Sequence, residues 1–410
     1  MLERSKCMNV PEIRFKEFCD YYSDVLLEKC LSVSNKKNNK LEYKKEDALS
    51  VSDEFGVVNQ IEHLGRSYTG NNISTYKILN KGQIVYTKSP LKLKPFGIIK
   101  VNNNKPGIVS VLYAIYDVKE GFDPNYISVY FEPNFRLNRY LLPLINKGAK
   151  NTINISDETA LSGEVHIPLS YAEQQKIASY FQSLDSLIQT TSKELTSLKQ
   201  IKAASLQYMF PQEGETVPKV RFKGFEGEWE KIPFGSFLKE SYERSTVENE
   251  DILLSSAITG VYLNSELFGH QRGSSNIGYK KIKKNMLILS AQNLHLGNAN
   301  VNLRFEHGLI SPAYKVYEIV NISPLFLQQW IKMDSTKSFF LNATTAGASL
   351  CRKNIVWDDL YKQIVLIPSK NEQVKIGLFF SNLDKQISLQ TQRLEKLKQI
   401  KAACLDKMFV

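Results

Sequence analysis

The sequence has few of the residues that mark a secreted, metal-binding or membrane protein. Its five cysteines are scattered without a C-x-x-C pair, and it has only five histidines. A zinc ribbon or finger needs close-set Cys or His ligands, so we expect no metal site. Unpaired cysteines at scattered positions are typical of reduced thiols in the cytoplasm. No stretch reaches about 18 consecutive apolar residues, and the segment MLERSKCMNVPEIRF has no signal-peptide core. We therefore expect a cytoplasmic protein with no membrane partner.

Motifs of catalysis are lacking too. The sequence has no G-x-x-x-x-G-K-[ST] loop for ATP and no H-E-x-x-H pair, and its histidines lie in no recognisable nucleophile context. Asp123-Pro124-Asn125-Tyr126 resembles the D/N-P-P-Y/F loop of adenine methyltransferases, but Asn replaces the second Pro. Phe222–Gly227 has the glycines of a methyl-donor loop without the helix pattern that should follow it. The sequence predicts a chain that is not an enzyme and binds no cofactor itself.

What the chain does have is positive charge and enough apolar residues for real cores. Lys and Arg number 53 against 42 Asp and Glu, for a net charge of +11, and 42% of residues are hydrophobic. An excess of positive charge favours polyanions, chiefly nucleic acid and secondarily anionic membrane surfaces. At 410 residues the chain is long enough for two or three domains.

An internal repeat is the strongest signal in the sequence. Val165–Phe210 aligns with Val365–Phe409 with one deletion, and LKQIKAA is identical at Leu198–Ala204 and Leu397–Ala403. VPEIRFKEF at Val10–Phe18 returns as VPKVRFKGF at Val217–Phe225, and between start and end the match is much looser. Each copy therefore has near-identical ends, which indicate shared scaffold, and a divergent middle, which indicates two versions of one fold with different tasks.

The conserved end of each copy predicts a long helix of about 37 residues, or roughly 55 Å. Apolar residues recur in steps of four and three, the 3.5-residue period of a helix that pairs with another helix. Two matching seams in one chain favour pairing with each other, antiparallel, with a globular domain at each end; two separate core helices or a homodimeric coiled coil are the alternatives. The seam residues are Ile177, Phe181, Leu184, Ile188, Leu195 and Leu198 in the first helix, and Ile376, Phe380, Leu383, Ile387, Leu394 and Leu397 in the second. Lys193, Lys199, Lys202, Arg393, Lys396, Lys398 and Lys401 are expected on the outer faces.

The middles predict mixed globular domains with more strand than helix, which makes the chain α+β with pseudo-twofold symmetry. GQIVYT, FGIIKV and GIVSVLYAIYDV in the first, and NMLILSAQ, GLISPAYKVYEIV and KQIVLIP in the second, are β-branched and aromatic runs bounded by Gly, Asn and Pro. One helix is expected at Pro124–Leu144 and one at Pro324–Leu341. The predicted divisions are a tail (1–9), domain 1 (10–165), a central helix and linker (166–216), domain 2 (217–365) and a C-terminal helix (366–410).

Basic clusters in the loops of both middles are candidates for phosphate contacts, and polar side chains are candidates for base contacts. A single such cluster is more often a solvated surface, but clusters recur in both halves. The candidate DNA-binding residues are Lys88, Lys92, Lys94, Lys150, Lys280, Lys281, Lys283, Lys284, Gln292, Asn293, Thr344, Ser349, Arg352 and Lys353. Lys36, Lys37 and Lys40 form a further basic cluster, and Asn298 and Asn300 are further polar candidates.

The repeated pattern resembles the specificity subunit of type I restriction–modification systems. The resemblance is carried by the VP-x-[IV]-RFK-x-F start, the I-P…E-Q-x-K-I opening of each helix, the L-D step (Leu184-Asp185, Leu383-Asp384) and the LKQIKAA…MF ending. Thr344–Leu350, leading to Ile355, Trp357 and Ile367-Pro368, is similar to the end of that family's target-recognition domains. The resemblance covers essentially the whole chain from Val10. The first copy lacks the G-F-E-G-E-W-E continuation of Gly224–Glu230, and we expect Tyr22 in the place of Trp229.

The resemblance implies that each domain reads one half of a split target in double-stranded DNA, while the helices fix the gap. It also implies two methyltransferase subunits that use S-adenosylmethionine to methylate adenine N6, and restriction and translocase subunits that use ATP and Mg²⁺. A coiled-coil scaffold that binds no specific DNA is the main alternative. A self-contained methyltransferase is the third, and the missing Gly-rich loop argues against it.

Overall fold

The structure, a computed structural model, describes residues 10–91, 93–147, 153–268, 275–345 and 353–410. The chain forms two compact units, and each combines stretches that are distant in sequence. Unit 1 comprises Met1–Thr191 and Arg393–Val410, and unit 2 comprises Ser192–Gln392. Two long helices, α5 (Tyr171–Tyr208) and α10 (Lys370–Lys407), therefore each contribute one part to unit 1 and the other to unit 2.

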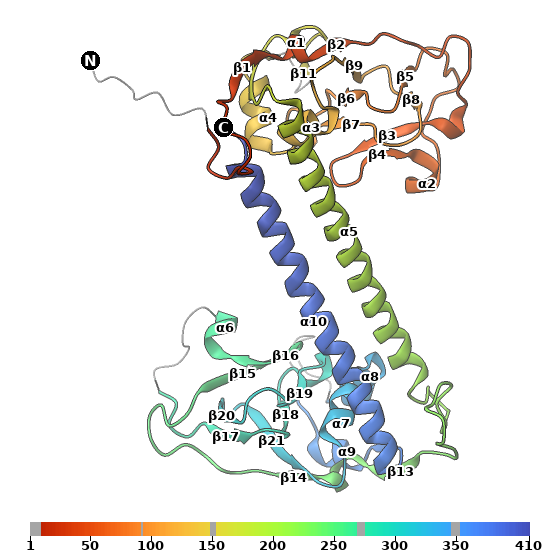
Figure 1. Cartoon of the computed structure of the whole chain (residues 1–410). Coiled ribbons are helices and arrows are strands. Elements are labelled where there is room, and N and C mark those ends of the chain that lie inside the picture. Colours follow the sequence, from red (N-terminus) through yellow and green to blue (C-terminus); the bar gives the residue numbers. More distant parts are fainter. Residues whose placement is uncertain (1–9, 92, 148–152, 269–274, 346–352) are drawn as a thin grey trace. The chain divides into compact units, whose positions relative to one another are not determined.

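The globular part of unit 1 is built from short strands and short helices (Figure 1). Its elements are β1 (Ser23–Leu26), α1 (Leu27–Cys30), β2 (Leu31–Val33), η1 (Lys45–Asp47), β3 (Leu49–Ser52), β4 (Gly56–Asn59), α2 (Gln60–Leu64), β5 (Lys77–Leu79), β6 (Ile84–Tyr86), β7 (Ile99–Val101), β8 (Gly107–Val109), β9 (Ala114–Val118), α3 (Pro124–Tyr130), α4 (Asn134–Leu141), β10 (Asn146–Lys147), β11 (Ile153–Asn154), η2 (Thr159–Leu161) and β12 (Glu164–Ile167).

The globular part of unit 2 has a closely similar series of elements. They are β13 (Glu230–Pro233), η3 (Phe234–Phe237), β14 (Leu238–Glu240), β15 (Leu253–Ala257), β16 (Gly260–Leu263), α6 (Asn264–Phe268), β17 (Lys280–Lys283), β18 (Leu287–Ser290), η4 (Leu294–Leu296), β19 (Ala299–Val301), β20 (His307–Ile310), β21 (Tyr314–Ile319), α7 (Pro324–Trp330), α8 (Asp334–Leu341), α9 (Trp357–Lys362) and β22 (Ile364–Ile367).

The sheets repeat from one unit to the other even where the sequences diverge. A four-stranded sheet has the order β2-β9-β6-β7 in unit 1 and β14-β21-β18-β19 in unit 2. The β1–β12 pair of unit 1 corresponds to the β13–β22 pair of unit 2. Unit 2 also has a sheet β16-β15-β20-β17, in which β15 and β20 are parallel. In unit 1 the equivalent strands form two separate pairs, β3–β4 and β5–β8. A parallel bridge between Ala48 and Ile108 joins these pairs. The repeat in the sequence is thus a repeat of topology.

The repeated E-Q pair at the start of each long helix joins that helix to its globular domain. In unit 1 Arg14 donates to both carboxylate oxygens of buried Glu173, at 2.7 Å each. In unit 2 Arg221 makes the equivalent pair with Glu372, at 2.6 and 2.8 Å. These carboxylate hydrogen bonds raise the pKa of both arginines. A buried charge is costly unless it is paired and hydrogen-bonded in this way.

The neighbouring glutamine of each E-Q pair fixes the short helix that packs beside the long one. The Oε1 atom of Gln174 accepts from the backbone N–H of Asp123 at 2.9 Å, and its Nε2 atom donates to Pro168 O. Gln373 makes the same two contacts in unit 2, with Ser323 N at 2.8 Å and Pro368 O at 2.9 Å. The repeated sequence therefore encodes one polar joint between domain and helix, built twice.

The end of each long helix is buried in the core of the opposite repeat's globular domain: α10 ends in unit 1, and α5 ends in unit 2. Met408 and Phe409, at the end of α10, are buried in the core of unit 1 with Phe181 and Tyr126. Met209 and Phe210, at the end of α5, are buried in the core of unit 2, where Phe210 stacks on Phe326 at 5.5 Å. The repeated M-F ending is thus an exchange of helix ends that closes both cores.

Within each unit the parts of α5 and α10 pack together in an antiparallel manner. In unit 1 Phe181 contacts Phe409, and one helical turn further along α5 Asp185 pairs with Lys401 at 2.5 Å. In unit 2 Lys202 pairs with Asp384 at 2.5 Å, and Gln390 donates to Glu194 at 3.1 Å. The L-D step and the second lysine of LKQIKAA are therefore the two ends of an ion pair between helices.

The predicted seam residues face the interior, and the first ones of each helix also belong to the domain cores. Ile177 and Phe181 are part of the core of unit 1, and Ile376, Phe380 and Leu383 part of the core of unit 2. Leu184, Leu195 and Leu394 are buried, and the remaining four, Ile188, Leu198, Ile387 and Leu397, are half-buried. The first seam residues of each helix thus pack against the globular domain, and the later ones lie where the two helices pack together.

Two expectations from the sequence are wrong. Lys202 and Lys401 do not lie on outer faces, because each forms the ion pair with the neighbouring helix. The single helix expected at Pro124–Leu144 is two, α3 and α4, and that at Pro324–Leu341 is α7 and α8. Pro133 explains the first break, because proline disfavours helical conformation in the residue before it. The Ile331–Met333 segment of unit 2 contains no proline, yet the helix is interrupted at the same place as in unit 1.

The D-P-N-Y fragment has a local structural role. Asp123 caps α3: its Oδ1 atom accepts from the backbone N–H of Tyr126 at 2.9 Å, and Pro124 occupies the first turn. Asp at the cap and Pro in the first turn are common helix-start residues. Tyr126 is fully buried in the core of unit 1. The fragment is therefore a helix start with an enclosed aromatic ring.

One position differs in charge between the two joints and leads to a pH-dependent prediction. Glu132 in unit 1 accepts from Lys401 at 2.5 Å, but unit 2 has Lys332 at the equivalent place, close to Lys202. Burial, and then repulsion by Lys202, lowers the pKa of Lys332 to about 8. Its Nζ atom donates to the carbonyls of Ile258 and Ala299 at 2.7 and 2.8 Å. An unfolded chain keeps this proton up to about pH 10.4.

We expect the stability of unit 2 to rise between about pH 8 and pH 10.4, because the unfolded chain then binds the proton that folded Lys332 has lost. Relative to Lys332→Met, the wild type should gain roughly 2–3 kcal/mol over this range. All three tryptophans, Trp229, Trp330 and Trp357, lie in unit 2, so urea unfolding followed by tryptophan fluorescence reports on that unit. A constant difference between the two proteins from pH 7 to pH 10 would contradict the assignment.

Candidate nucleic-acid interface

Most of the lysines predicted from the sequence are neutralised by carboxylates of their own unit. Lys88 follows β6 and donates to Asp157 at 2.5 Å. Lys94 lies 3.3 Å from Asp53 and donates to the carbonyl of Glu132 at 2.8 Å. Lys92 and Lys150 lie outside the described residues. A carboxylate paired in this way offsets part of the charge that the lysine offers to a phosphate.

Unit 2 has the same kind of pairing along β17, with one exception. Lys281 pairs with Glu250, Lys283 with Glu243 at 3.5 Å, and Lys284 with Glu306 at 2.5 Å. Lys280 is only 6% exposed and, in the part of the chain that the structure describes, has no side-chain hydrogen bond or ion pair. The sequence grouped these four lysines as one cluster, whereas the structure separates Lys280 from the rest.

The polar candidates also divide into exposed and enclosed residues. Gln292 is exposed and Asn293 half-buried, in the turn that follows β18. Asn298 and Asn300 are buried and hold β19 to β15 through Ser256, so they are not free to read base edges. This corrects the expectation for these two asparagines. Their side chains hydrogen-bond to buried Ser256 instead, as most buried polar side chains bond within the protein.

The end of the second domain is described only in part. Thr344 is half-buried, donates to the carbonyl of Leu341 at 2.7 Å and forms a bridge with Ile355. Lys353 is half-buried and has no acidic partner among the described residues. Ser349 and Arg352 lie outside the described residues.

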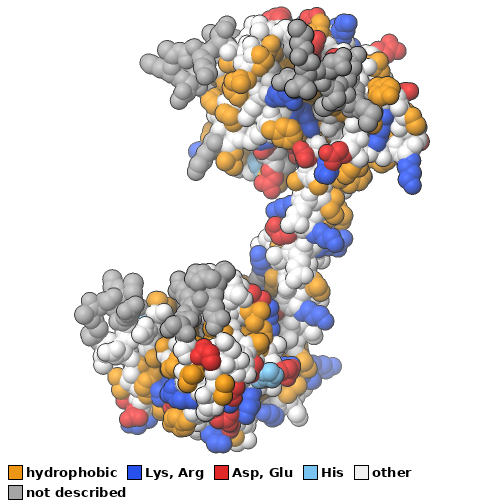
Figure 2. Space-filling view, turned by 90° about the vertical axis from the view of Figure 1, so that its left-hand side faces the viewer, with side chains coloured by type: hydrophobic (Ala, Val, Ile, Leu, Met, Phe, Trp, Pro, Cys, Tyr) orange, Lys and Arg blue, Asp and Glu red, His pale blue; other side chains and the backbone are white. Residues whose placement is uncertain are grey.

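The exposed charge is mixed rather than of one sign. On the face drawn in Figure 2, Lys and Arg side chains of both globular parts are scattered among Asp and Glu side chains. Lys36, Lys37 and Lys40, in the loop after β2, are exposed and have no acidic partner in the described structure. On the long helices, Lys193, Lys199, Arg393, Lys396 and Lys398 are exposed. The net charge of +11 is therefore not gathered into a single basic patch on this face.

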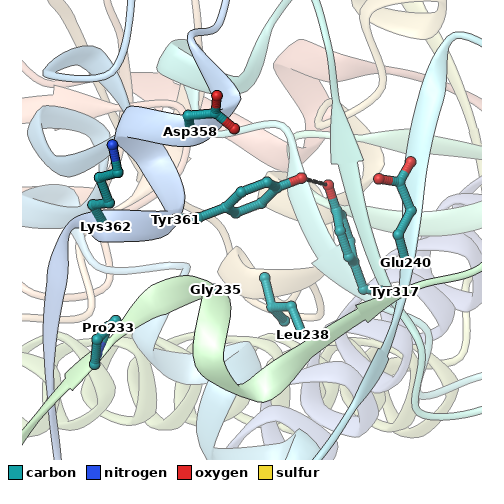
Figure 3. Close-up of a pocket in the computed structure, with 8 residues that line it drawn as sticks. All are labelled: Pro233, Gly235, Leu238, Glu240, Tyr317, Asp358, Tyr361 and Lys362. Carbon is teal, nitrogen blue, oxygen red and sulfur yellow. Dashed lines mark hydrogen bonds between the residues drawn. The ribbon is translucent and has the colours of Figure 1, made fainter.

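A pocket of about 620 Å³ lies in unit 2 beside α9 (Figure 3). Tyr317 from β21 and Tyr361 from α9 point toward each other across it, with their hydroxyl oxygens 2.7 Å apart. Glu240 from β14 stands beside Tyr317 and accepts from Lys315 at 2.9 Å. Burial, and then the hydrogen bond with Tyr361, raises the pKa of Tyr317. Gly235 is needed here because an added Cβ atom would lie 2.6 Å from the Cβ atom of Tyr361.

Sequence reasoning did not single out Arg244, Lys315 or the pocket residue Tyr361 as site residues, and it named Trp357 only as part of the ending of the second domain. The Nζ atom of Lys315 lies 4.5 Å from the centre of the Trp357 ring. Arg244 is exposed and bridges Lys280 through its backbone. No signal in the sequence unites these residues, because they come from a loop, a strand and a helix that are 42 to 117 positions apart. Among the described residues no group of three or more His, Cys, Asp or Glu side chains is placed to hold a metal ion. No helix of the described structure is long and apolar enough to cross a membrane.

Comparison with known proteins was informative at the level of structure. Neither a scan of protein-family models nor a search of curated proteins found a match to the sequence. A crystal structure of the S subunit of a type I restriction–modification system from M. genitalium matches with a TM-score of 0.56 at 12% identity, over 98% of this chain and 99% of that chain. This chain has the fold of a type I restriction–modification S subunit.

Two further solved structures are similar at lower scores. The HsdS subunit from Thermoanaerobacter tengcongensis is 14% identical, with a TM-score of 0.43 over 95% of this chain and 96% of that one. A chain from a type I R-M system studied for complex assembly and conformational transition is 12% identical, with a TM-score of 0.44 over 95% and 97%. Because both TM-scores are below 0.5, the assignment of the S-subunit fold rests on the M. genitalium structure.

Proposed function

We propose that this chain is the sequence-specific DNA-binding subunit of a type I restriction–modification complex. In this proposal residues 10–165 and 217–365 are two target-recognition domains, and each reads one half of a split DNA target. Residues 166–216 and 366–410 are the helical regions that join them. The S-subunit fold supports the proposal, together with the motifs that the two repeats share.

The observation that carries the proposal is a duplicated frame with unlike surfaces. The arginine–glutamate pair of each joint between domain and helix is repeated, as Arg14–Glu173 and Arg221–Glu372. The strands of the two domains differ in their side chains: buried Lys77 of unit 1 is paired with Asp157, whereas the equivalent Lys280 has no carboxylate partner among the described residues. Two different surfaces on one frame suit the reading of two different base sequences, because specificity comes from a few side chains on a positioned scaffold.

The partners in this proposal are double-stranded DNA, two methyltransferase subunits and the restriction and translocase subunits. The chemistry lies on those partners, which bind S-adenosylmethionine, ATP and Mg²⁺, and this chain contributes recognition only. The predicted lysines and polar residues that remain exposed or free of acidic partners, Lys280, Gln292 and Lys353 among them, are the first candidates for DNA contact. Lysines already paired, such as Lys88 and Lys284, would contribute less.

Genome-wide adenine methylation tests the function directly. We expect deletion of the gene, with the methyltransferase subunits still expressed, to abolish N6-methyladenine at one split motif, and the restored gene to bring it back. Long-read sequencing detects this modification and also gives the target. Unchanged methylation, with partners shown to be active, would favour the alternative of a coiled-coil scaffold that binds no specific sequence.

A further inference from the structure

Lys280, the first residue of β17, is a cation held in place without a counter-ion. Its side chain is covered along its length, since the residue is only 6% exposed, yet its amine nitrogen is not among the fully enclosed polar atoms. Within the described structure no side-chain hydrogen bond or ion pair involves this amine. A buried lysine is ordinarily paired, because an uncompensated charge costs stability.

The equivalent lysine of unit 1 shows what this position ordinarily requires. Lys77 opens β5 and pairs with Val109 of β8, as Lys280 pairs with Ile310 of β20. Lys77 is also buried, but its Nζ atom donates to Asp157 at 2.8 Å. Among the described residues of unit 2, no carboxylate pairs with Lys280 in this way. The segments outside the described residues of unit 2, 269–274 and 346–352, contain no Asp or Glu that would provide one.

The charged groups that face Lys280 make its surroundings positive. Arg244, bridged to it through the backbone, and Lys315 of β21 are both close enough to oppose its charge, and Glu240 favours it. Glu240 is already engaged by Lys315 at 2.9 Å. Burial, and then these two cations, lower the pKa of Lys280. Three cations against one carboxylate leave a local surplus of positive charge.

Flat aromatic surfaces border the same group of residues. The Trp357 ring lies 4.5 Å from the Lys315 ammonium, and Tyr361 lines the pocket beside Glu240. Asp358 and Lys362 line this pocket as well, from the exposed side of α9. Cations combined with aromatic faces are characteristic of surfaces that contact nucleic acid.

We infer that Lys280, with Arg244 and Lys315, forms a binding site for one phosphate of the DNA backbone, and this inference rests on the proposed function. The phosphate occupies the place that Asp157 takes in unit 1. It accepts from the Lys280 ammonium, whose packed side chain loses little conformational freedom on binding. Arg244 supplies the planar donor pair that suits a phosphate. The unpaired charge is then a cost in stability that phosphate binding offsets.

The test compares Lys280→Met with wild type, each as the full chain assembled with its methyltransferase subunits, using duplex DNA of mixed sequence at KCl concentrations from about 50 to 300 mM. Each phosphate contact adds about 0.9 to the slope of log K against log salt. We expect the Lys280→Met slope to be shallower by about 0.9 and its affinity at about 0.1 M salt to be about tenfold weaker. Lys281→Met is the matched control, because Lys281 is the next residue of the strand and is paired with Glu250. It should change the slope much less.

Folding of the variant is checked by tryptophan fluorescence, which reports on unit 2. Its unfolding midpoint should equal or exceed that of wild type, since a buried charge has been removed. An unchanged slope in Lys280→Met, with salt-dependent binding by wild type, overturns the phosphate site and leaves the proposed function standing. Wild-type protein without salt-dependent duplex binding overturns both. Protection of unit 2 by inorganic phosphate that depends on Lys280, without a change in the duplex slope, assigns the site to free phosphate and overturns the DNA contact.

Discussion

Replacing Arg221 by Met should lower the free energy of unfolding of unit 2 by about 3–5 kcal/mol, because it leaves a buried carboxylate without its partner. Glu372 is fully enclosed, and Arg221 meets both of its oxygens and also donates to the carbonyl of Gly227 at 2.6 Å. Urea unfolding followed by tryptophan fluorescence measures the loss, since Trp229, Trp330 and Trp357 all belong to unit 2.

The double variant Arg221→Met with Glu372→Leu separates the buried charge from general damage. Replacing both partners of a buried ion pair by apolar residues is often close to neutral, so the double variant should recover most of the loss. Arg14→Met, the matched change in unit 1, should leave the tryptophan transition nearly in place. A double variant as unstable as the single one would mean that the joint acts through shape rather than through charge.

Removing the aromatic ring that follows α10 should destabilise unit 1, whose globular part is formed by the first half of the chain. Phe409 is buried against Tyr126, Tyr130 and Phe181, and Arg136 lies over its ring at 4.6 Å. Phe409→Ala should cost about 3–5 kcal/mol, the usual loss for a buried phenylalanine. Hydrogen exchange should become faster in α3 and α4, which are more than 260 residues away in sequence.

The reciprocal variant provides the control. Phe210→Ala removes the equivalent ring from unit 2, where it contacts Trp229, Phe326 and Phe380. This variant should shift the tryptophan transition and leave exchange in α3 and α4 unchanged. If Phe409→Ala instead shifts the tryptophan transition and leaves hydrogen exchange in α3 and α4 unchanged, the placement of Phe409 in the core of unit 1 is wrong.

The architecture was predictable because the repeat is written in the sequence. The period of the seam residues predicted two long helices, and α5 and α10 each span 38 residues. The repeated E-Q, L-D and M-F elements were visible as well, but their partners were not. Arg14 and Glu173 are 159 positions apart, and nothing in their spacing joins them. A repeated motif shows that a contact is built twice, whereas three-dimensional structure shows what the contact is.

The candidate site was much less predictable than the fold. A cluster of lysines in the sequence carries no information on the carboxylates that fold against it, so Lys88 and Lys284 looked as available as Lys280. Asn298 and Asn300 looked like surface residues because asparagine is usually exposed, yet both bind Ser256 in the interior. Arg244 and Lys315 could not be recognised as site residues from the sequence, because only the fold places their loop and strand close to Lys280.

An exchange of domains tests the central claim most directly, namely that each globular part reads its own half of a split target. Residues 10–165 are replaced by the equivalent segment of another S subunit, and adenine methylation is mapped across the genome with the methyltransferase subunits present. We predict a new sequence in one half of the methylated motif, with the other half and the gap between them unchanged. A change in both halves, or a motif that stays the same while methylation continues, would contradict the account.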